Sequence, residues 1–183
     1  MLGRRNLIGS GLLMATAAVL AARRVAAQSP ACRPSPPAVE GPFYRPGTPL
    51  RASLLEPGIP GERVILEGRV LDTACRPVAG AVVDLWQADG SGEYDLAGYR
   101  CRGHQFTDDG GRFRFETVIP GRYGPRTPHF HVKVGRQGGP LLTTQLYFPG
   151  ESRNAADPLF DSRLLVARED GTVRYDFVID GVV

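Results

Sequence analysis

The sequence predicts an all-β fold, an antiparallel sandwich that follows a proline-rich N-terminal arm. From residue 63 onward, short runs rich in Val, Ile, Phe and Tyr are separated by Gly, Pro and Asp turn residues. No segment keeps the apolar period of a helix, and no internal repeat is present. Many short strands at regular spacing are typical of two packed antiparallel sheets.

The strands are expected at six places in the chain. Turn signals such as 108–111, 120–121 and 138–140 lie between them. In one expected strand, Phe113 and Phe115 alternate with arginines, which predicts one buried and one solvated face. The expected strands are 63–71, 80–88, 112–118, 128–135, 141–148 and 172–180.

The first part of the chain predicts export. Arg4 and Arg5 precede an apolar run over 7–22 and the small residues Val25-Ala26-Ala27, the layout of a secretory signal. The run is shorter than the roughly 20 residues of a spanning helix, so cleavage after Ala27 is favoured over a stable membrane anchor. We therefore expect a signal peptide over 1–27, an extended proline-rich arm over 28–60 and a β-sandwich domain over 61–183.

The paired arginines favour the twin-arginine route over an ordinary export signal. A second pair, Arg23-Arg24, lies near the expected cleavage site. Because that route carries folded proteins, a metal could be inserted before export to the periplasm or medium. Loss of residues 1–27 would remove four arginines and no acidic residue, leaving 18 Lys and Arg against 19 Asp and Glu. The basic balance belongs to the signal, so nucleic-acid binding is not indicated.

The chain has three cysteines, Cys32, Cys75 and Cys101. In an oxidising compartment, two of them are expected to form a disulfide and the third to remain a free thiol. They lack the paired C-x-x-C spacing of a zinc site. The sequence does not choose which two pair.

Two of the three histidines lie in the tripeptide His129-Phe130-His131. On a strand, residues two apart point the same way, so both imidazoles are expected on one face with Lys133. Such a pair can grip a metal ion, although two histidines on a solvated strand face would give the same pattern. Tyr123 lies in the turn before this strand, and Tyr94 follows the expected strand 80–88.

These motifs resemble a known family. The chain is similar to the intradiol ring-cleavage dioxygenases, which include protocatechuate 3,4-dioxygenase and catechol 1,2-dioxygenase. The similarity covers roughly Glu40 to Gly150 and implies a prealbumin-like sandwich. The segments that carry it are EGPFYRP, GRVLDTACRPVAGAVVDLWQADGSGEYD, RGHQFTDDGGRFRFETVIPGRYGPRTPHFHVKV and TTQLYF.

By motif, the resemblance implies a ferric centre held by Tyr94, Tyr123, His129 and His131. The W-x-A-x-x-x-G-x-Y element ends at Tyr94, P-G-x-Y ends at Tyr123, and R-x-x-H-x-H begins at Arg126. Family precedent makes Tyr123 and His131 axial, and has a catechol displace Tyr123, which then helps to take up a proton. Phenolate is a hard anionic oxygen donor that suits Fe(III) better than Fe(II), zinc or copper(I). The substrates implied are a catechol and O₂.

Two further side chains receive roles from the resemblance. The fixed charge of Arg126 would stabilise negative charge on the activated ring, or it could pair with a surface acid. Gln145 would donate a hydrogen bond to the substrate, or it could be a satisfied polar residue at the edge of the sandwich. Among other candidates, Tyr99 could compete with Tyr94, and His104 is expected to be a hydrogen-bonding residue rather than a ligand. Trp86 and Tyr147 are expected in the core or the pocket wall, and 108–111 is expected to be a tight turn rather than a calcium site.

The chain also departs from the family. It lacks the helical dimerisation segment of catechol-type members. The intervals from Tyr94 to Tyr123 and from Tyr123 to His129 are shorter than in many relatives. A more exposed iron and catechols met outside the cytoplasm are therefore expected, and a homo-oligomer is compatible with the sequence. The main alternative is a non-catalytic prealbumin-like binding module, which would not explain R-x-x-H-x-H and two tyrosines. A copper or Fe(II) oxygenase is a further alternative, but such Fe(II) sites usually use two histidines and a carboxylate.

Overall fold

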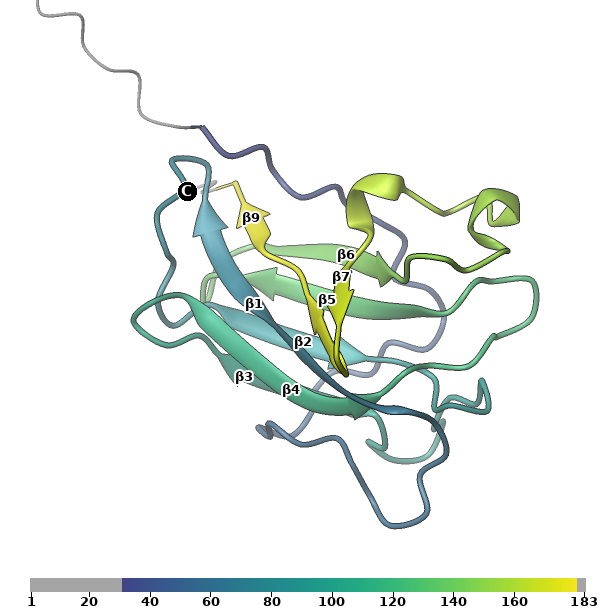
Figure 1. Ribbon diagram of the computed structural model, residues 1–183. Coiled ribbons are helices and arrows are strands. Elements are labelled where there is room, and N and C mark those ends of the chain that lie inside the picture. Colours follow the sequence, from purple (N-terminus) through teal and green to yellow (C-terminus); the bar gives the residue numbers. More distant parts are fainter. Residues whose placement is uncertain (1–30, 181–183) are drawn as a thin grey trace, which may run out of the picture.

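Two β-sheets face each other in the computed structural model, which describes residues 31–180 (Figure 1). One sheet has the order β4-β1-β8-β7, with β9 also pairing with β1, and the other has the order β3-β2-β5-β6. The expected all-β sandwich is confirmed. The strands are β1 (Arg63–Asp72), β2 (Val82–Trp86), β3 (Arg102–Phe106), β4 (Arg112–Val118), β5 (His129–Gly135), β6 (Leu141–Tyr147), β7 (Ala167–Glu169), β8 (Thr172–Arg174) and β9 (Phe177–Ile179).

Every expected strand has a counterpart, but the last one is divided and two further strands occur. The expected 172–180 splits into β8 and β9, because the Asp176 carboxylate accepts the Arg69 N–H at 2.8 Å where a backbone carbonyl would otherwise do so. β3 and β7 were not expected, since β3 contains Gly103 and polar residues, and all three residues of β7 are exposed. Pairing with neighbouring strands forms these two elements, rather than apolar alternation.

The pairs of these strands are antiparallel except for β1–β8 and β1–β9, which are parallel. A parallel pair needs a long connection. Here the chain leaves β6 and returns to the first sheet through two short 3₁₀ helices, η1 (Asn154–Ala156) and η2 (Ser162–Leu164). This connection places residues 149–165 beside the end of the second sheet.

The core lies between the sheets. Leu66 and Phe115 from one sheet meet Val83, Phe130 and Val132 from the other, and all five are fully buried. Burial of each such side chain contributes roughly 1.5–3 kcal/mol. Most outward-facing residues of β2 and β5 are buried too, so the second sheet is covered on both faces.

The N-terminal arm supplies much of that second cover. It first runs along the edge of β6, where the Ala38 N–H donates to the Thr143 carbonyl at 2.9 Å. It then crosses the sheet, and the Tyr44 and Thr48 hydroxyls both donate to Asp84 on β2, at 3.1 and 2.9 Å. Among the described residues, no helix is long and apolar enough to cross a membrane. The expected signal peptide, 1–27, lies outside the described residues.

A disulfide anchors the start of the arm. Cys32 pairs with Cys75, in the turn after β1, with Cα atoms 5.2 Å apart. Cys101 is a free, buried cysteine, and burial raises the pKa of its thiol to about 12. The structure therefore selects one of the pairings that the sequence left open.

Replacing Cys32 and Cys75 together by serine is expected to lower the free energy of unfolding by about 2–4 kcal/mol, because the bridge closes a long loop in the unfolded chain. Urea unfolding followed by circular dichroism measures this difference. Wild-type protein treated with a reductant serves as the control and should unfold like the variant. A variant that unfolds within about 0.5 kcal/mol of the oxidised wild type would contradict the prediction.

Candidate metal centre

The register of three strands gathers polar and aromatic side chains on the outer face of the second sheet. His131 lies opposite Trp86 on β2 and opposite Gln145 on β6, while His129 lies opposite Tyr147. Alternate residues of a strand share a face, so these five side chains lie together and Phe130 points into the core.

The two imidazoles converge. Their Nε2 atoms lie 3.0 Å apart, a distance at which they share one proton or face one cation. His129 Nδ1 lies 2.7 Å from the Thr127 carbonyl, which can only accept, so in the neutral ring Nδ1 carries the hydrogen and Nε2 is free to coordinate. Trp86 stacks on His131 with ring centroids 4.9 Å apart and fixes the plane of that ring.

Tyr94 is held in the loop between β2 and β3. The Asp89 carboxylate accepts the Ser91 and Glu93 N–H groups at 2.9 and 3.2 Å and shapes the turn before it. Phe43 of the arm stacks on the Tyr94 ring, with centroids 4.3 Å apart and planes 17° apart. Tyr94 is consequently buried, although it belongs to a loop.

Tyr123 lies in the connection between β4 and β5 and is 43% exposed. Its ring is perpendicular to those of Tyr94 and Phe43, with centroids 5.6 and 4.9 Å away. The Tyr94 ring lies 6.3 Å from that of His131. The structure thus brings Tyr94, Tyr123, His129 and His131 into one cluster.

The two tyrosine loops dock through backbone atoms. The Gly121 N–H donates to the Asp89 carbonyl at 2.7 Å. Gly92 has a φ of +86°, and a Cβ there would lie 2.1 Å from the Arg122 carbonyl oxygen. The glycine of the W-x-A-x-x-x-G-x-Y motif is therefore needed for the two loops to approach each other.

Arg126 is held in place by hydrogen bonds near the two histidines. Its Nε donates to Asp157 at 2.8 Å, and its Nη2 donates to Gln145 Oε1 at 2.7 Å and to the Tyr147 hydroxyl at 3.2 Å. The Gln145 amide donates to the Val39 carbonyl of the arm at 2.6 Å. Both ends of the Gln145 side chain are therefore engaged within the protein.

Burial governs the protonation of the cluster. It lowers the pKa of His129 to about 4 and that of His131 well below its usual range, so both rings are neutral at pH 7. Burial also raises the pKa of Tyr94 to about 12, while the positive charges of Arg126 and Arg102 act in the opposite direction. The Tyr94 phenol therefore needs a cation to ionise at neutral pH.

This set of donors fits a ferric ion. Two neutral imidazoles present coordinating nitrogens beside two phenols whose ionised oxygens are hard anionic donors. His131 Nδ1 is buried without a hydrogen-bond partner, so no carbonyl or carboxylate competes for the orientation of this ring. In the part of the chain that the structure describes, no carboxylate or cysteine joins the histidines to make a group of three.

The chain is similar to a group of known proteins. Residues 39–182 match a family model described as dioxygenase, which covers most of the chain and includes every residue of the cluster. The chain belongs to the intradiol ring-cleavage dioxygenase family.

Among the intradiol dioxygenases, the protocatechuate 3,4-dioxygenase beta chain of Burkholderia cepacia is 36% identical over 131 residues, which is 60% of this chain and 54% of that protein. The 6-chlorohydroxyquinol 1,2-dioxygenase of Cupriavidus pinatubonensis is 33% identical over 171 residues, 77% of this chain and 62% of that protein. The chain thus spans little more than half the length of these curated relatives. The dioxygenase domain of a carbohydrate-binding fusion from Streptomyces sp. SirexAA-E is 47% identical, with a TM-score of 0.78, and the match covers 81% of this chain and 99% of that domain.

Other candidates from the sequence have partners elsewhere in the protein. The Tyr99 hydroxyl donates to the Pro46 carbonyl at 3.0 Å, and His104 Nδ1 lies 2.8 Å from the Thr48 carbonyl. The Asp108 carboxylate accepts the Gly110 and Arg112 N–H groups at 2.9 and 2.7 Å, as in a tight turn. These contacts account for the three positions without a ligand.

Three residues of the site carried no assignment from the sequence. Asp157 forms an ion pair with Arg126, and Phe43 covers Tyr94. Arg102 is buried and donates to the backbone carbonyls of Phe43 and Asp95. The motif EGPFYRP contains Phe43 and gave the only sequence signal among them. Contacts of Asp157 and Arg102 depend on segments far apart in the chain.

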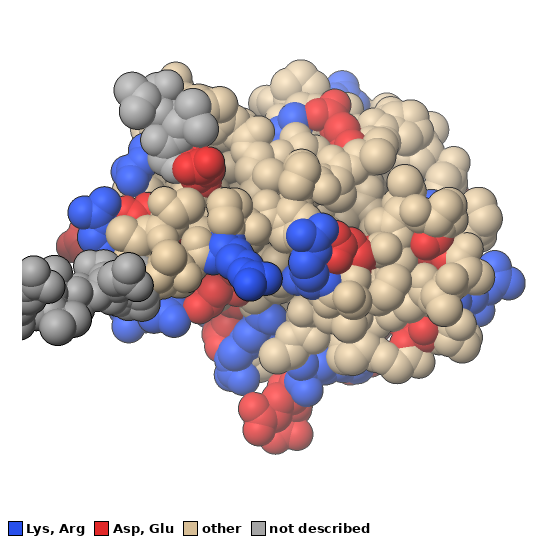
Figure 2. Space-filling model, turned by 90° about the horizontal axis from the view of Figure 1, so that it is seen from above, with Lys and Arg blue, Asp and Glu red and all other residues tan. Residues whose placement is uncertain are grey.

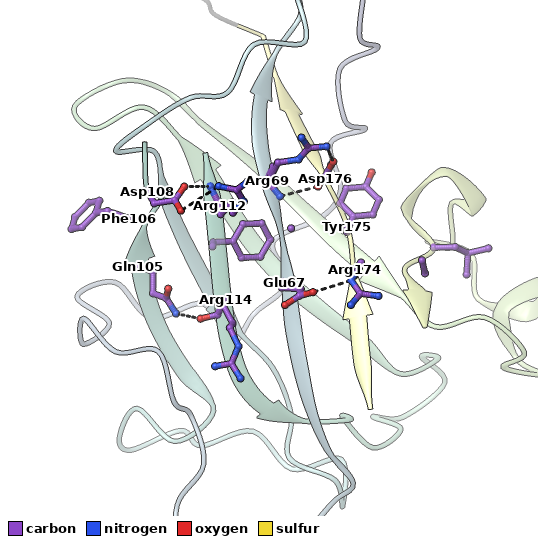
Figure 3. A pocket seen from close by; sticks show the side chains of 14 residues that line it. Glu67, Arg69, Gln105, Phe106, Asp108, Arg112, Arg114, Arg174, Tyr175 and Asp176 are labelled. Carbon is purple, nitrogen blue, oxygen red and sulfur yellow. Dashed lines mark hydrogen bonds and ion pairs between the residues drawn. The ribbon is translucent and has the colours of Figure 1, made fainter. Parts of the chain in front are cut away.

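A separate groove of about 1000 Å³ lies on the outer face of the first sheet (Figure 3). Its charged side chains pair with one another, as in Arg69–Asp176 and Glu67–Arg174. None of Tyr94, Tyr123, His129 and His131 lines it. On the face seen in Figure 2, basic and acidic side chains are likewise interspersed rather than gathered by sign.

Replacing Asp157 by asparagine is expected to lower the free energy of unfolding at pH 7 by on the order of 3 kcal/mol, since Arg126 loses a buried counter-ion. Although burial opposes it, hydrogen bonds from Arg126, Leu159 and Thr127 lower the pKa of Asp157 in the folded protein. The stabilisation is therefore present above the ordinary aspartate pKa of about 4 and is lost as pH falls through the folded value.

Urea unfolding of wild type and variant between pH 7 and pH 3 measures this effect. The difference between the two proteins should be largest at pH 7 and shrink in acid. Glu116→Gln, which breaks an exposed pair with Arg114, is the control and should change stability by less than about 1 kcal/mol. A difference that is constant with pH would contradict the role given to the carboxylate.

Proposed function

We propose that the chain is a non-haem Fe(III)-dependent dioxygenase that opens catechol-type rings between the two hydroxyl-bearing carbons. O₂ supplies both inserted oxygen atoms, and the product is a muconate-type diacid. The observation that supports this most is the convergence of two phenols and two neutral imidazoles in a chain of the intradiol family.

Tyr94, Tyr123, His129 and His131 are the residues that would hold the ion. When bound, ferric iron would supply a Lewis-acidic centre that takes both catechol oxygens and makes the ring reactive toward O₂. Two phenolates offset two of its positive charges, which favours the ferric over the ferrous state.

The two tyrosines have different surroundings and therefore different tasks. Tyr94 is stacked under Phe43 and is buried, so it stays in place. Tyr123 is 43% exposed and touches neighbouring rings only edge to face, so it can swing toward solvent. Its oxygen, a phenolate while it held the ion, would then take up the proton of the substrate hydroxyl and become a neutral phenol.

Arg126 would provide a fixed positive charge beside the aromatic ring of the substrate. Asp157 and Gln145 hold its guanidinium, which needs no reorganisation as negative charge grows on the substrate. Gln145 in turn links β6 to the arm through the Val39 carbonyl. We assign it the task of holding Arg126 and the arm in register, in addition to any contact with the substrate.

We propose further that the protein acts outside the cytoplasm. The Cys32–Cys75 disulfide supports this, because such bridges persist in oxidising compartments. The sequence of residues 1–27 supports it independently, as a secretory signal of twin-arginine type. Catechols released from plant material are substrates that an exported enzyme would meet.

Iron-loaded protein is expected to be red-brown, with a broad visible band from tyrosinate bound to Fe(III) that moves to longer wavelength when catechol is added. Tyr94→Phe and Tyr123→Phe should each weaken the band. Tyr99→Phe is the matched control and should leave it unchanged, since its hydroxyl donates to Pro46. A folded, iron-loaded sample of the wild type that is colourless would contradict the proposal.

Arg126→Gln is expected to lower kcat/KM for catechol cleavage by roughly 10²-fold while iron content and the visible band persist, because the charge acts on the transition state rather than on the metal. Arg122→Gln is the control: this neighbouring arginine is exposed and pairs with Glu151 at 3.6 Å. Assays run well below the unfolding temperature keep both variants folded. Equal loss of activity in the two variants would refute a specific role for Arg126.

A further inference from the structure

Arg102, the first residue of β3, is a buried cation that the proposed chemistry does not use. The residue is 1% exposed. Its Nη1 donates to the Phe43 carbonyl at 2.6 Å, and its Nη2 donates to the Asp95 carbonyl at 3.0 Å. Its Nε has no hydrogen-bond partner. The direct partners of this guanidinium are therefore backbone carbonyls rather than a carboxylate.

Such a position is costly for the fold. A buried guanidinium loses its hydration, and the two carbonyls offer only partial compensation. Burial accordingly lowers the pKa of Arg102 from its usual value. An apolar side chain of similar size would fill the same space without that cost, so packing alone does not account for an arginine here.

The geometry of the guanidinium suggests what it does. Its planar fork holds two donors at a fixed angle, which allows one side chain to bind two acceptors at once. One acceptor belongs to the arm at Phe43, and the other belongs to Asp95, directly after Tyr94. The two segments are distant in sequence and meet at this side chain.

The segments joined in this way carry side chains that stack on each other. The Phe43 ring lies 4.3 Å from the Tyr94 ring, with planes 17° apart. Phe43 also contacts Tyr123 edge to face at 4.9 Å. A shift of either backbone segment would slide the Phe43 ring off Tyr94 and leave the Tyr94 phenol free to rotate.

We propose that Arg102 is a positioning residue of the metal centre, which clamps the arm to the Tyr94 loop so that Phe43 fixes the orientation of the Tyr94 phenol. This rests on the proposed function, since the orientation of Tyr94 matters for chemistry only if its oxygen binds the metal. The clamp itself is a property of the protein and is measurable apart from activity.

The test compares the full-length, iron-loaded wild type with Arg102→Lys and Arg102→Gln. Lysine keeps the charge but has no fork, and glutamine keeps a donor without the charge, so at least one soluble variant is expected. Arg51→Lys is the matched control. Arg51 also donates to backbone carbonyls, but to those of Tyr99 and Arg102 rather than to those of Phe43 and Asp95.

Hydrogen exchange and the visible spectrum are read together. In both Arg102 variants, amides of 40–46 and 91–98 should exchange faster by roughly tenfold, the effect of losing about one hydrogen bond. The part of the tyrosinate band that disappears in Tyr94→Phe should also weaken, at unchanged iron content. Arg51→Lys should show neither change.

Wild-type exchange and an intact band in the Arg102 variants would overturn the proposal, as would equal changes in Arg51→Lys. A wild type without any tyrosinate band would instead reject the ferric function. In that case the exchange data alone decide whether Arg102 clamps the two segments: faster exchange confined to its variants supports the clamp, and unchanged exchange rejects it.

Discussion

The pairing register of β2, β5 and β6 is the constraint on which the site depends. It sets Trp86, His131 and Gln145 in one row across the sheet and His129 beside Tyr147 in another. A slip of one residue in β5 would turn both imidazoles into the core and bring Phe130 out. The apolar side of the same strand resists that slip, because Phe130, Val132 and Val134 are fully buried between the sheets. Core packing therefore fixes the chemistry on the opposite face.

The arm turns that outer face into an interior. Without it, the histidines would lie on a solvated strand, the arrangement in which an H-x-H pattern has no special consequence. Hydrogen bonds from Tyr44 and Thr48 to Asp84, and from Gln145 to Val39, hold the arm across the sheet. The resulting burial lowers the pKa values of His129 and His131 and raises that of Tyr94, which keeps these three side chains neutral at pH 7.

Local patterns predicted the parts of this site that depend on local geometry. The alternation of a strand was enough to place both imidazoles on one face, and the motifs that end at Tyr94 and Tyr123 marked the two tyrosines that lie near them. Distant partners left no such pattern. Asp157 reaches Arg126 only because the connection after β6 folds back, and the Cys32–Cys75 pair depends on the path of the arm. β3 could not be predicted from the sequence either, because its pairing with β2 rather than its own residue pattern makes it a strand.

Charge balance links these distant contacts to the site. The two arginines near the cluster have different partners. The partly buried Arg126 has the Asp157 carboxylate at 2.8 Å, whereas the buried Arg102 has only carbonyl oxygens and an unpartnered Nε. One guanidinium is thus paired with a carboxylate and the other is not, and both lie near Tyr94, whose pKa burial raises to about 12. Both arginines lower the pKa of Tyr94, and so they would assist a bound cation in ionising this phenol. Burial by the arm opposes ionisation of Tyr94 and the two arginines favour it, so the arm and the cations around the cluster act on the same phenol proton.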